Sequence, residues 1–218
     1  MADWFQTAFK DFGEFPAWAW IVLAVLLVGG VIAYRSLKGG HKTVWNTKMM
    51  AMGAVCIALS SVLSMIKIWK MPQGGSITAA SMLPLMLFSY VYGMGPGCLV
   101  GALYGVLQFI IEPYFLSLPQ MLLDYPIAFG MMGLAGLFSK MDNENLGLTV
   151  GVVLASVGRF VAAVLSGVIF FAEYAGDQNP WVYSIVYNGS YMLPECIICV
   201  ILCLAVGLRL ARQLKKNK

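Results

Sequence analysis

Ionisable side chains interrupt segments of this sequence that are otherwise apolar, and Asp124 is the first of them to consider. Asp124 follows Gln120 by four residues, so the two side chains share one helix face. The ring of Tyr125 adjoins the carboxylate, and the two together could hold a cation through charge and a cation–π contact. In the alternative interpretation, Asp124 pairs with a lysine or with a helix terminus.

A second group of polar side chains falls in residues 173–195, which begin as a polar loop and continue as an apolar helix. Four-residue steps place Tyr183, Tyr187, Tyr191 and Glu195 on one face, with Ser184 and Asn188 beside them. Polar groups are costly inside a membrane unless they face a cavity or a partner. We interpret this helix as the wall of a pocket for a small cationic or aromatic molecule. The alternative is that the tyrosines anchor the helix at the interface and the polar groups join helices.

Three further ionisable residues lie in or beside apolar segments. Glu112 ends one such segment, in line with Gln108 four residues earlier, and it could face the same pocket or simply be hydrated. Arg159 and Glu195 fall at comparable depth in their segments. Because an unpaired charge inside a membrane is costly, we predict that these two form a structural ion pair.

The composition indicates a membrane protein that crosses the bilayer several times. Of the 218 residues, 60% are hydrophobic and only 11% are charged, and the mean hydropathy is +0.80. The sequence holds one histidine, His41, and no G-x-x-x-x-G-K-[ST] motif, which argues against Ser-His-Asp catalysis and against ATP hydrolysis by a phosphate loop. We therefore expect a binding protein without catalytic activity. No metal or cofactor is expected, because the C-x-x-C of Cys196 and Cys199 has no further ligands nearby.

Apolar runs predict an all-α integral membrane fold. Seven helices are expected, at about 17–34, 49–68, 77–92, 96–111, 119–138, 147–172 and 181–208. We divide the chain into two parts. Residues 1–44 hold an interfacial segment, an extra transmembrane helix and a basic linker, and residues 45–218 form a six-helix substrate-binding domain.

The distribution of Lys and Arg predicts the orientation. If the basic loop 35–48 is cytoplasmic, ten Lys and Arg residues fall inside and three outside, which agrees with the positive-inside rule. The N-terminus is then extracellular and the C-terminus cytoplasmic. The loops at 69–76, 112–118 and 173–180 share the outer side, close to Asp124.

Small residues mark two sites of close helix contact. Gly97, Gly101 and Gly105 form a double G-x-x-x-G, for which we favour packing inside the protein. Ala54 and Ala58 form an A-x-x-x-A, for which either internal packing or an outward-facing dock is possible.

Six short stretches together resemble a known family. They are PQGGSI at 72–77, SMLP at 81–84, YFLSLPQMLLDY at 114–125, RF at 159–160, SGVIFF at 166–171 and YSIVYNG at 183–189. In this order the stretches resemble the thiamine-specific substrate-binding (S) components of energy-coupling factor (ECF) transporters. The resemblance covers about residues 48–212, so the helix at 17–34 lies outside it.

The resemblance implies a six-helix S-component bundle with an outward-facing site, capped by the loop 69–76. Asp124 occupies the place of an acidic residue that faces the positively charged ring of the substrate. The matching pocket positions are Tyr114, Tyr125, Tyr183 and Asn188, and we add Tyr187, Phe171 and Gly75 to the substrate site. Ala163 and Phe171 stand where some members have histidine and tryptophan. Ala54 and Ala58 match the motif that docks on a transmembrane coupling subunit, which carries two ATPase subunits.

The expected function is therefore capture of thiamine on the outer face of the cell membrane for import driven by partner ATPases. Thiamine has a permanently charged thiazolium ring and a flat aminopyrimidine ring, which suit a carboxylate, aromatic rings and an amide. Lipid is the other expected contact, and nucleic acid is not expected as a partner. Two alternatives remain: an S component for another vitamin or a precursor such as hydroxymethylpyrimidine, and a membrane enzyme acting on a lipid-linked substrate through Asp142 and Glu144.

Overall fold

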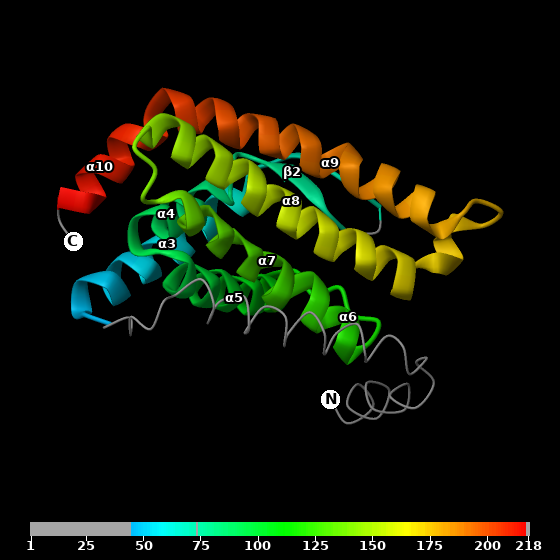
Figure 1. Ribbon diagram of the computed structural model, residues 1–218. Coiled ribbons are helices and arrows are strands. Elements are labelled where there is room, and N and C mark those ends of the chain that lie inside the picture. Colours follow the sequence, from blue (N-terminus) through cyan, green and yellow to red (C-terminus); the bar gives the residue numbers. More distant parts are fainter. Residues whose placement is uncertain (1–44, 73, 217–218) are drawn as a thin grey trace.

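The structure is a computed structural model that describes residues 45–72 and 74–216 (Figure 1). The interfacial segment, the extra transmembrane helix and the basic linker predicted in residues 1–44 lie outside the described residues.

The described chain is mostly helical, with one β-hairpin near its start. Its first elements are α3 (Thr47–Met65), β1 (Lys67–Lys70), β2 (Ser76–Thr78), α4 (Leu83–Tyr92) and α5 (Met94–Ile111). A continuous helical segment follows, made of α6 (Leu118–Leu122), the π-helical η2 (Leu123–Ile127), α7 (Ala128–Gly130) and the 3-10 helix η3 (Met131–Phe138). The chain ends with α8 (Glu144–Phe170), the short η4 (Ala172–Ala175), α9 (Pro180–Leu202), η5 (Cys203–Gly207) and α10 (Leu208–Lys216).

Five helical segments of the described chain are long and apolar enough to cross a membrane. They are Thr47–Met65, Met94–Ile111, Leu118–Phe138, Glu144–Phe170 and Pro180–Lys216. Large apolar side chains such as Val62, Ile110 and Val186 are exposed on their outer faces, as expected for contact with lipid. The predicted all-helical membrane fold is thus confirmed in its main features.

The apolar run predicted at 77–92 folds differently from a full membrane span. Its first residues complete strand β2, which pairs antiparallel with β1, and only Leu83–Tyr92 is helical. At 1.5 Å per residue, a ten-residue helix is about 15 Å long, half the thickness of the hydrocarbon core. Every residue of α4 is buried, so this short helix forms the centre of the bundle rather than a lipid-facing wall.

Local side-chain signals set the starts of the long helices. Asn46, Asn143 and Asn179 each precede a helix, and each side chain accepts a hydrogen bond from a backbone N–H of the first turn. In α9 the next residue, Pro180, is also favourable because the first helical position needs no N–H donor.

Glycines bring α5 close to the segment that carries Asp124. A Cβ atom at Gly101 would lie 2.3 Å from the carbonyl oxygen of Phe129, and one at Gly105 would lie 2.4 Å from that of Tyr125. The predicted internal packing of these glycines is confirmed, since any larger residue would push the two helices apart.

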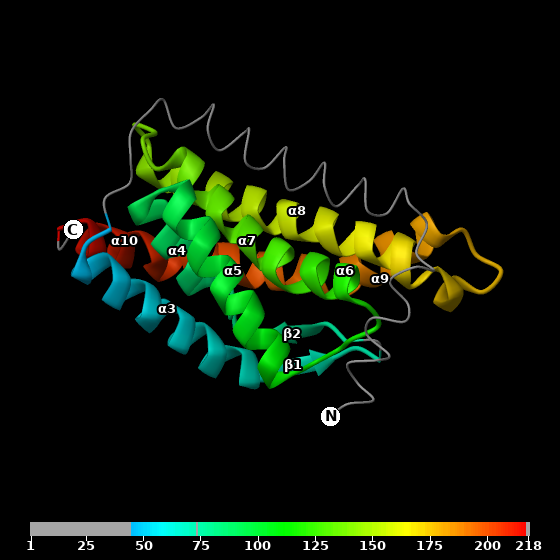
Figure 2. The same cartoon turned by 90° about the horizontal axis from the view of Figure 1, so that it is seen from below.

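The loops gather at two opposite ends of the bundle. The start of α3, the turn at 139–143 and α10 lie at one end, whereas α6 and the connection between α8 and α9 lie at the other (Figure 1). The tip of the β-hairpin points toward this second end (Figure 2). Helices α8 and α9 run side by side along the bundle, and β2 packs against α9. The second end corresponds to the side of the membrane on which the sequence analysis predicted the polar and aromatic loops.

Candidate functional site

A cavity of about 450 Å³ lies at the second end, between the hairpin, α5, the α6–η2 segment, α8 and α9. All eight predicted substrate-site residues border it. Its aromatic members are Tyr114, Tyr125, Phe171, Tyr183 and Tyr187, and Asp124, Asn188 and Gly75 complete the set. The tertiary structure thus brings together residues that are as many as 113 positions apart in the sequence.

Asp124 reaches the cavity from the π-helical segment η2, which contains Pro126. Proline cannot donate the usual helical hydrogen bond, and π-bulges often occur at functional sites. The Gln120 amide donates to Asp124 over 2.6 Å, while the Gln120 carbonyl accepts from the backbone N–H of Leu116 over 3.0 Å. Because the Leu116 N–H can only donate, the NH₂ of Gln120 must face Asp124. The carboxylate therefore borders the cavity in a fixed orientation.

Tyr125 fixes the loop that follows α5. Its hydroxyl donates to the backbone carbonyl of Glu112 and accepts from the backbone N–H of Tyr114, both over 2.9 Å. Its ring meets that of Phe109 edge to face, with the centroids 5.2 Å apart. Tyr125 thus holds Tyr114, whose ring belongs to one aromatic wall of the cavity.

This wall is a cluster of three aromatic rings. Tyr114 stacks on Phe171 with the centroids 5.7 Å apart, and Phe171 lies 6.0 Å from Tyr174. The hydroxyls of Tyr114 and Tyr174 are 3.4 Å apart. This hydrogen bond and partial burial raise the pKa of Tyr114 to about 12, so the phenol stays neutral at physiological pH. The wall offers a flat, uncharged aromatic face to a ligand.

The tyrosines of α9 form the opposite wall and hold the hairpin. Tyr183 stacks on Tyr187 at 5.9 Å, and Tyr187 meets Tyr191 edge to face at 6.1 Å. The Tyr187 hydroxyl donates to the carbonyl of Gly74 over 2.9 Å. A Cβ atom on Gly75 would lie 2.8 Å from the Tyr191 ring, so only glycine fits between the hairpin and α9.

Asn188 joins α9 to α8 beside the cavity. Its amide nitrogen donates to Ser184 and to the carbonyl of Ala163, and its oxygen accepts from the hydroxyl of Tyr191 over 2.8 Å. Ser184 in turn donates to the carbonyl of Val164. The polar face predicted on α9 therefore stabilises the cavity wall as well as bordering the cavity.

The predicted ion pair between Arg159 and Glu195 is wrong. Glu195 is buried and accepts hydrogen bonds from the hydroxyls of Thr78 and Ser81 instead. The Arg159 guanidinium lies over the Phe129 ring, 4.4 Å from its centroid, and Arg159 borders the cavity. Similar depth in two helices does not fix which way each side chain points around its helix, and here the two groups point to different surroundings.

Some residues that border the cavity were not predicted from the sequence. They include Ser166, Phe129, Tyr174 and the hairpin lysines Lys67 and Lys70. Ser166 lies within a stretch that matches the family, which was the only signal for it. The sequence gave no signal for the hairpin lysines. They border the cavity because β1 pairs with β2, and this pairing was not predicted.

The cavity therefore combines aromatic faces and amide groups with two carboxylates, Asp124 and Glu112, and the cationic side chains of Lys67, Lys70 and Arg159 also border it. Among residues 45–72 and 74–216 there is no group of three His, Cys, Asp or Glu side chains that could hold a metal ion. This chemistry suits a flat, positively charged organic molecule.

A family comparison identifies the kind of protein that has this site. Residues 50–215 match the model of the family described as thiamine transporter protein (Thia_YuaJ). The chain belongs to this family. The family expected from the sequence is thereby confirmed, and the chain is a multi-pass membrane protein of a transporter family rather than an enzyme.

Individual relatives agree with this assignment. The chain is 37% identical over 160 residues to the thiamine transporter ThiT of Bacillus subtilis, covering 68% of this chain and 83% of that one. It is 27% identical over 148 residues to ThiT of Lacticaseibacillus paracasei, covering 61% and 73%. The fold is similar to that of ThiT from Listeria monocytogenes, with a TM-score of 0.67 and 24% identity over 77% of this chain and 96% of that one.

Proposed function

We propose that this chain is the S component of an ECF-type importer and that it binds thiamine in the cavity beside Asp124. The observation that carries this proposal is the position of the Asp124 carboxylate at a cavity walled by two groups of aromatic rings. The cavity volume of about 450 Å³ lies within the range of about 300–1,000 Å³ that is usual for small-ligand pockets.

The carboxylate, the aromatic rings and the amide of the site each have a complementary part in thiamine. Asp124 supplies the negative charge for the thiazolium ring, and Tyr114, Phe171 and Tyr183 supply flat faces for either ring. The Asn188 carbonyl accepts one hydrogen bond from Tyr191, so a second lone pair remains for the exocyclic amino group of the pyrimidine. Tyr125, Tyr187 and Gly75 position these groups through the contacts described above.

The direct test is isothermal titration calorimetry of the purified full-length protein with thiamine and with hydroxymethylpyrimidine. Because hydroxymethylpyrimidine lacks the thiazolium charge, we expect thiamine to bind at least tenfold more tightly. Equal or tighter binding of hydroxymethylpyrimidine would favour the alternative that the pyrimidine alone is the natural ligand. No heat with either compound would contradict the proposed function.

The proposed docking site for the transmembrane coupling subunit is the face of α3 that bears Ala54 and Ala58. Both alanines are exposed, so they are not used for packing within the described chain. Small side chains allow another helix to approach closely. The coupling subunit would then connect thiamine binding to two ATPase subunits.

The docking proposal is tested by Ala54→Trp, with Val157→Trp as the control on the exposed face of α8. Both variants should bind thiamine normally in calorimetry. In cells that contain the partner subunits, only Ala54→Trp should abolish uptake of labelled thiamine. Normal uptake by Ala54→Trp, or equal loss in the control, would contradict the docking site.

The cavity lies at the outer end in our proposed orientation, with an extracellular N-terminus and a cytoplasmic C-terminus. Helix α10 and the turn at 139–143 then lie at the cytoplasmic end (Figure 1), and their basic residues, which include Lys140, Arg212 and Lys215, agree with the positive-inside rule. At that end Glu144 forms ion pairs with Arg212 and Lys215, which accounts for this carboxylate without any role in catalysis.

A further inference from the structure

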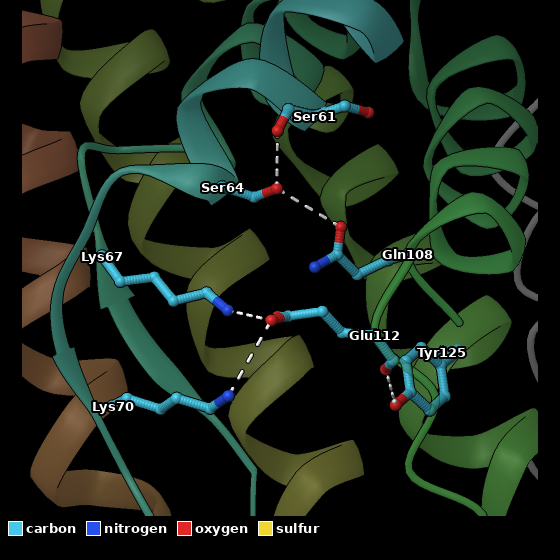
Figure 3. Close-up of polar contacts among 7 residues, drawn as sticks. All are labelled: Ser61, Ser64, Lys67, Lys70, Gln108, Glu112 and Tyr125. Carbon is cyan, nitrogen blue, oxygen red and sulfur yellow. Dashed lines mark hydrogen bonds and ion pairs between the residues drawn. The ribbon is translucent and has the colours of Figure 1, made fainter. Parts of the chain in front are cut away.

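Glu112 contacts two separate walls of the cavity with different atoms. Its carboxylate forms an ion pair with Lys67 and lies 4.0 Å from Lys70, and both lysines belong to β1 (Figure 3). Its backbone carbonyl accepts the hydrogen bond from Tyr125, the residue that follows Asp124 (Figure 3). One residue at the end of α5 therefore links the hairpin to the segment that carries the acidic side chain.

The ion pair with Lys67 is partly shielded from solvent. The side chains of Lys67 and Glu112 are 21% and 41% exposed, whereas that of Lys70 is 68% exposed. Partial burial reduces screening by water and salt, so the pair with Lys67 should be the stronger of the two. All three side chains border the cavity.

The hairpin has a second attachment on the other side of the cavity. Tyr187 holds its turn through the carbonyl of Gly74, and Gly75 packs against Tyr191. Strand β1 itself is mostly exposed, with Ile68, Trp69 and Lys70 open to the surroundings. The hairpin thus spans the cavity between α9 and α5, and the ion pair to Glu112 is its attachment on the α5 side.

We propose that Glu112 is a positioning residue that controls how fast the bound ligand leaves. Its ion pair with Lys67 holds β1 beside the cavity, and its backbone holds Tyr125 next to Asp124. This inference rests on the proposed function, because the ligand is taken to be thiamine. It predicts that weakening the ion pair speeds dissociation of the ligand, whereas association changes little because the binding groups themselves remain.

The experiment measures association and dissociation of labelled thiamine on the full-length protein in nanodiscs. We expect Glu112→Gln and Lys67→Gln each to raise the dissociation rate about three- to tenfold, with the association rate unchanged within about twofold. The double variant should dissociate no faster than either single variant, because both remove the same interaction. Arg212→Gln, which breaks a comparable ion pair at the opposite end, is the control and should leave both rates unchanged.

Two further measurements separate this role from a general loss of structure. High salt should accelerate dissociation more strongly from the wild type than from Glu112→Gln, because only the wild type retains the ion pair with Lys67. Exchanging the charges in Lys67→Glu with Glu112→Lys should restore slow dissociation in part. Unchanged dissociation rates, additive effects in the double variant, or the same salt dependence in Glu112→Gln would each overturn the proposal. Absence of thiamine binding by the wild type would overturn the proposed function, and this inference with it.

Discussion

The two acidic side chains within the helices Leu118–Phe138 and Pro180–Leu202 have contrasting surroundings. Asp124 borders the cavity and is oriented by the amide of Gln120. Glu195 is only 1% exposed, is not among the residues that line the cavity, and accepts hydrogen bonds from the hydroxyls of Thr78 and Ser81. Both carboxylates lie on helices that cross the membrane, yet only one of them faces space that a ligand can fill.

The difference shows how a membrane protein can keep two acidic groups for different purposes. Hydroxyl donors that surround Glu195 stabilise the junction between β2, the turn after it and α9, so this carboxylate is part of the structure. Asp124 is oriented by the neutral amide of Gln120 at the edge of the cavity, and Arg159, which borders the same cavity, interacts with it electrostatically. A cation in the cavity would therefore meet a charged partner that is already in position.

The largest expected effect tests the ligand side of this contrast. Asp124→Asn keeps the shape of the side chain but removes its charge, and a hydrogen bond or contact to a charged group contributes about 1.5–3 kcal/mol. We expect thiamine affinity in calorimetry to fall about 10- to 150-fold. Binding of hydroxymethylpyrimidine should change much less, because that molecule has no thiazolium charge. An unchanged affinity for thiamine would exclude Asp124 from the site.

The next effect tests the structural side. Glu195→Ala leaves the hydroxyls of Thr78 and Ser81 buried without their acceptor, and we expect the free energy of unfolding to fall by about 2 kcal/mol. Glu195→Gln retains an acceptor oxygen and should lose less. Denaturation of the two variants in detergent measures the difference. A loss of thiamine affinity in Glu195→Gln as large as that in Asp124→Asn would erase the contrast between the two carboxylates.

A smaller effect tests how the hairpin closes the cavity region. Gly75→Ala places a methyl group against the Tyr191 ring and strains a backbone with φ of +77°, so we expect thiamine affinity to fall about tenfold. Gly74 is the matched control, because it also has positive φ, at +85°, but nothing lies within 4 Å of its Cβ position. Equal losses in Gly74→Ala and Gly75→Ala would mean that backbone strain, not contact with Tyr191, causes the effect.

The smallest effect concerns a single hydrogen bond. Tyr187→Phe retains the ring but removes the donor to the Gly74 carbonyl, a loss of about 1 kcal/mol. We expect thiamine affinity to fall about fivefold in calorimetry, less than for Gly75→Ala. A decrease as large as that for Asp124→Asn would show that the Tyr187 hydroxyl contacts the ligand directly.

Much of the fold and the set of residues around the cavity could be predicted from the sequence. Long apolar runs predicted all five segments of the described chain that can cross a membrane, because a run of about twenty apolar residues favours a lipid environment. Four-residue steps correctly placed Tyr183, Tyr187 and Tyr191 on one face of α9. Their roles in ligand binding remain predictions.

Other features could not be predicted because they depend on partners distant in the chain. The run at 77–92 is apolar enough for a membrane helix, but pairing with β1 and a central position in the bundle shortened its helix to Leu83–Tyr92. The predicted pair of Arg159 and Glu195 failed for a similar reason. Hydroxyls from the end of β2 and from the turn after it lie beside Glu195, and the Phe129 ring lies beside Arg159.

The sequence by itself determined which segments enter the membrane and which residue types line up along each helix, because hydropathy and helical periodicity are local properties. Only the tertiary structure decided which carboxylate faces a cavity and which is surrounded by donors. That choice depends on how helices rotate and pack against one another, and the close contacts at Gly101 and Gly105 are part of what sets it here.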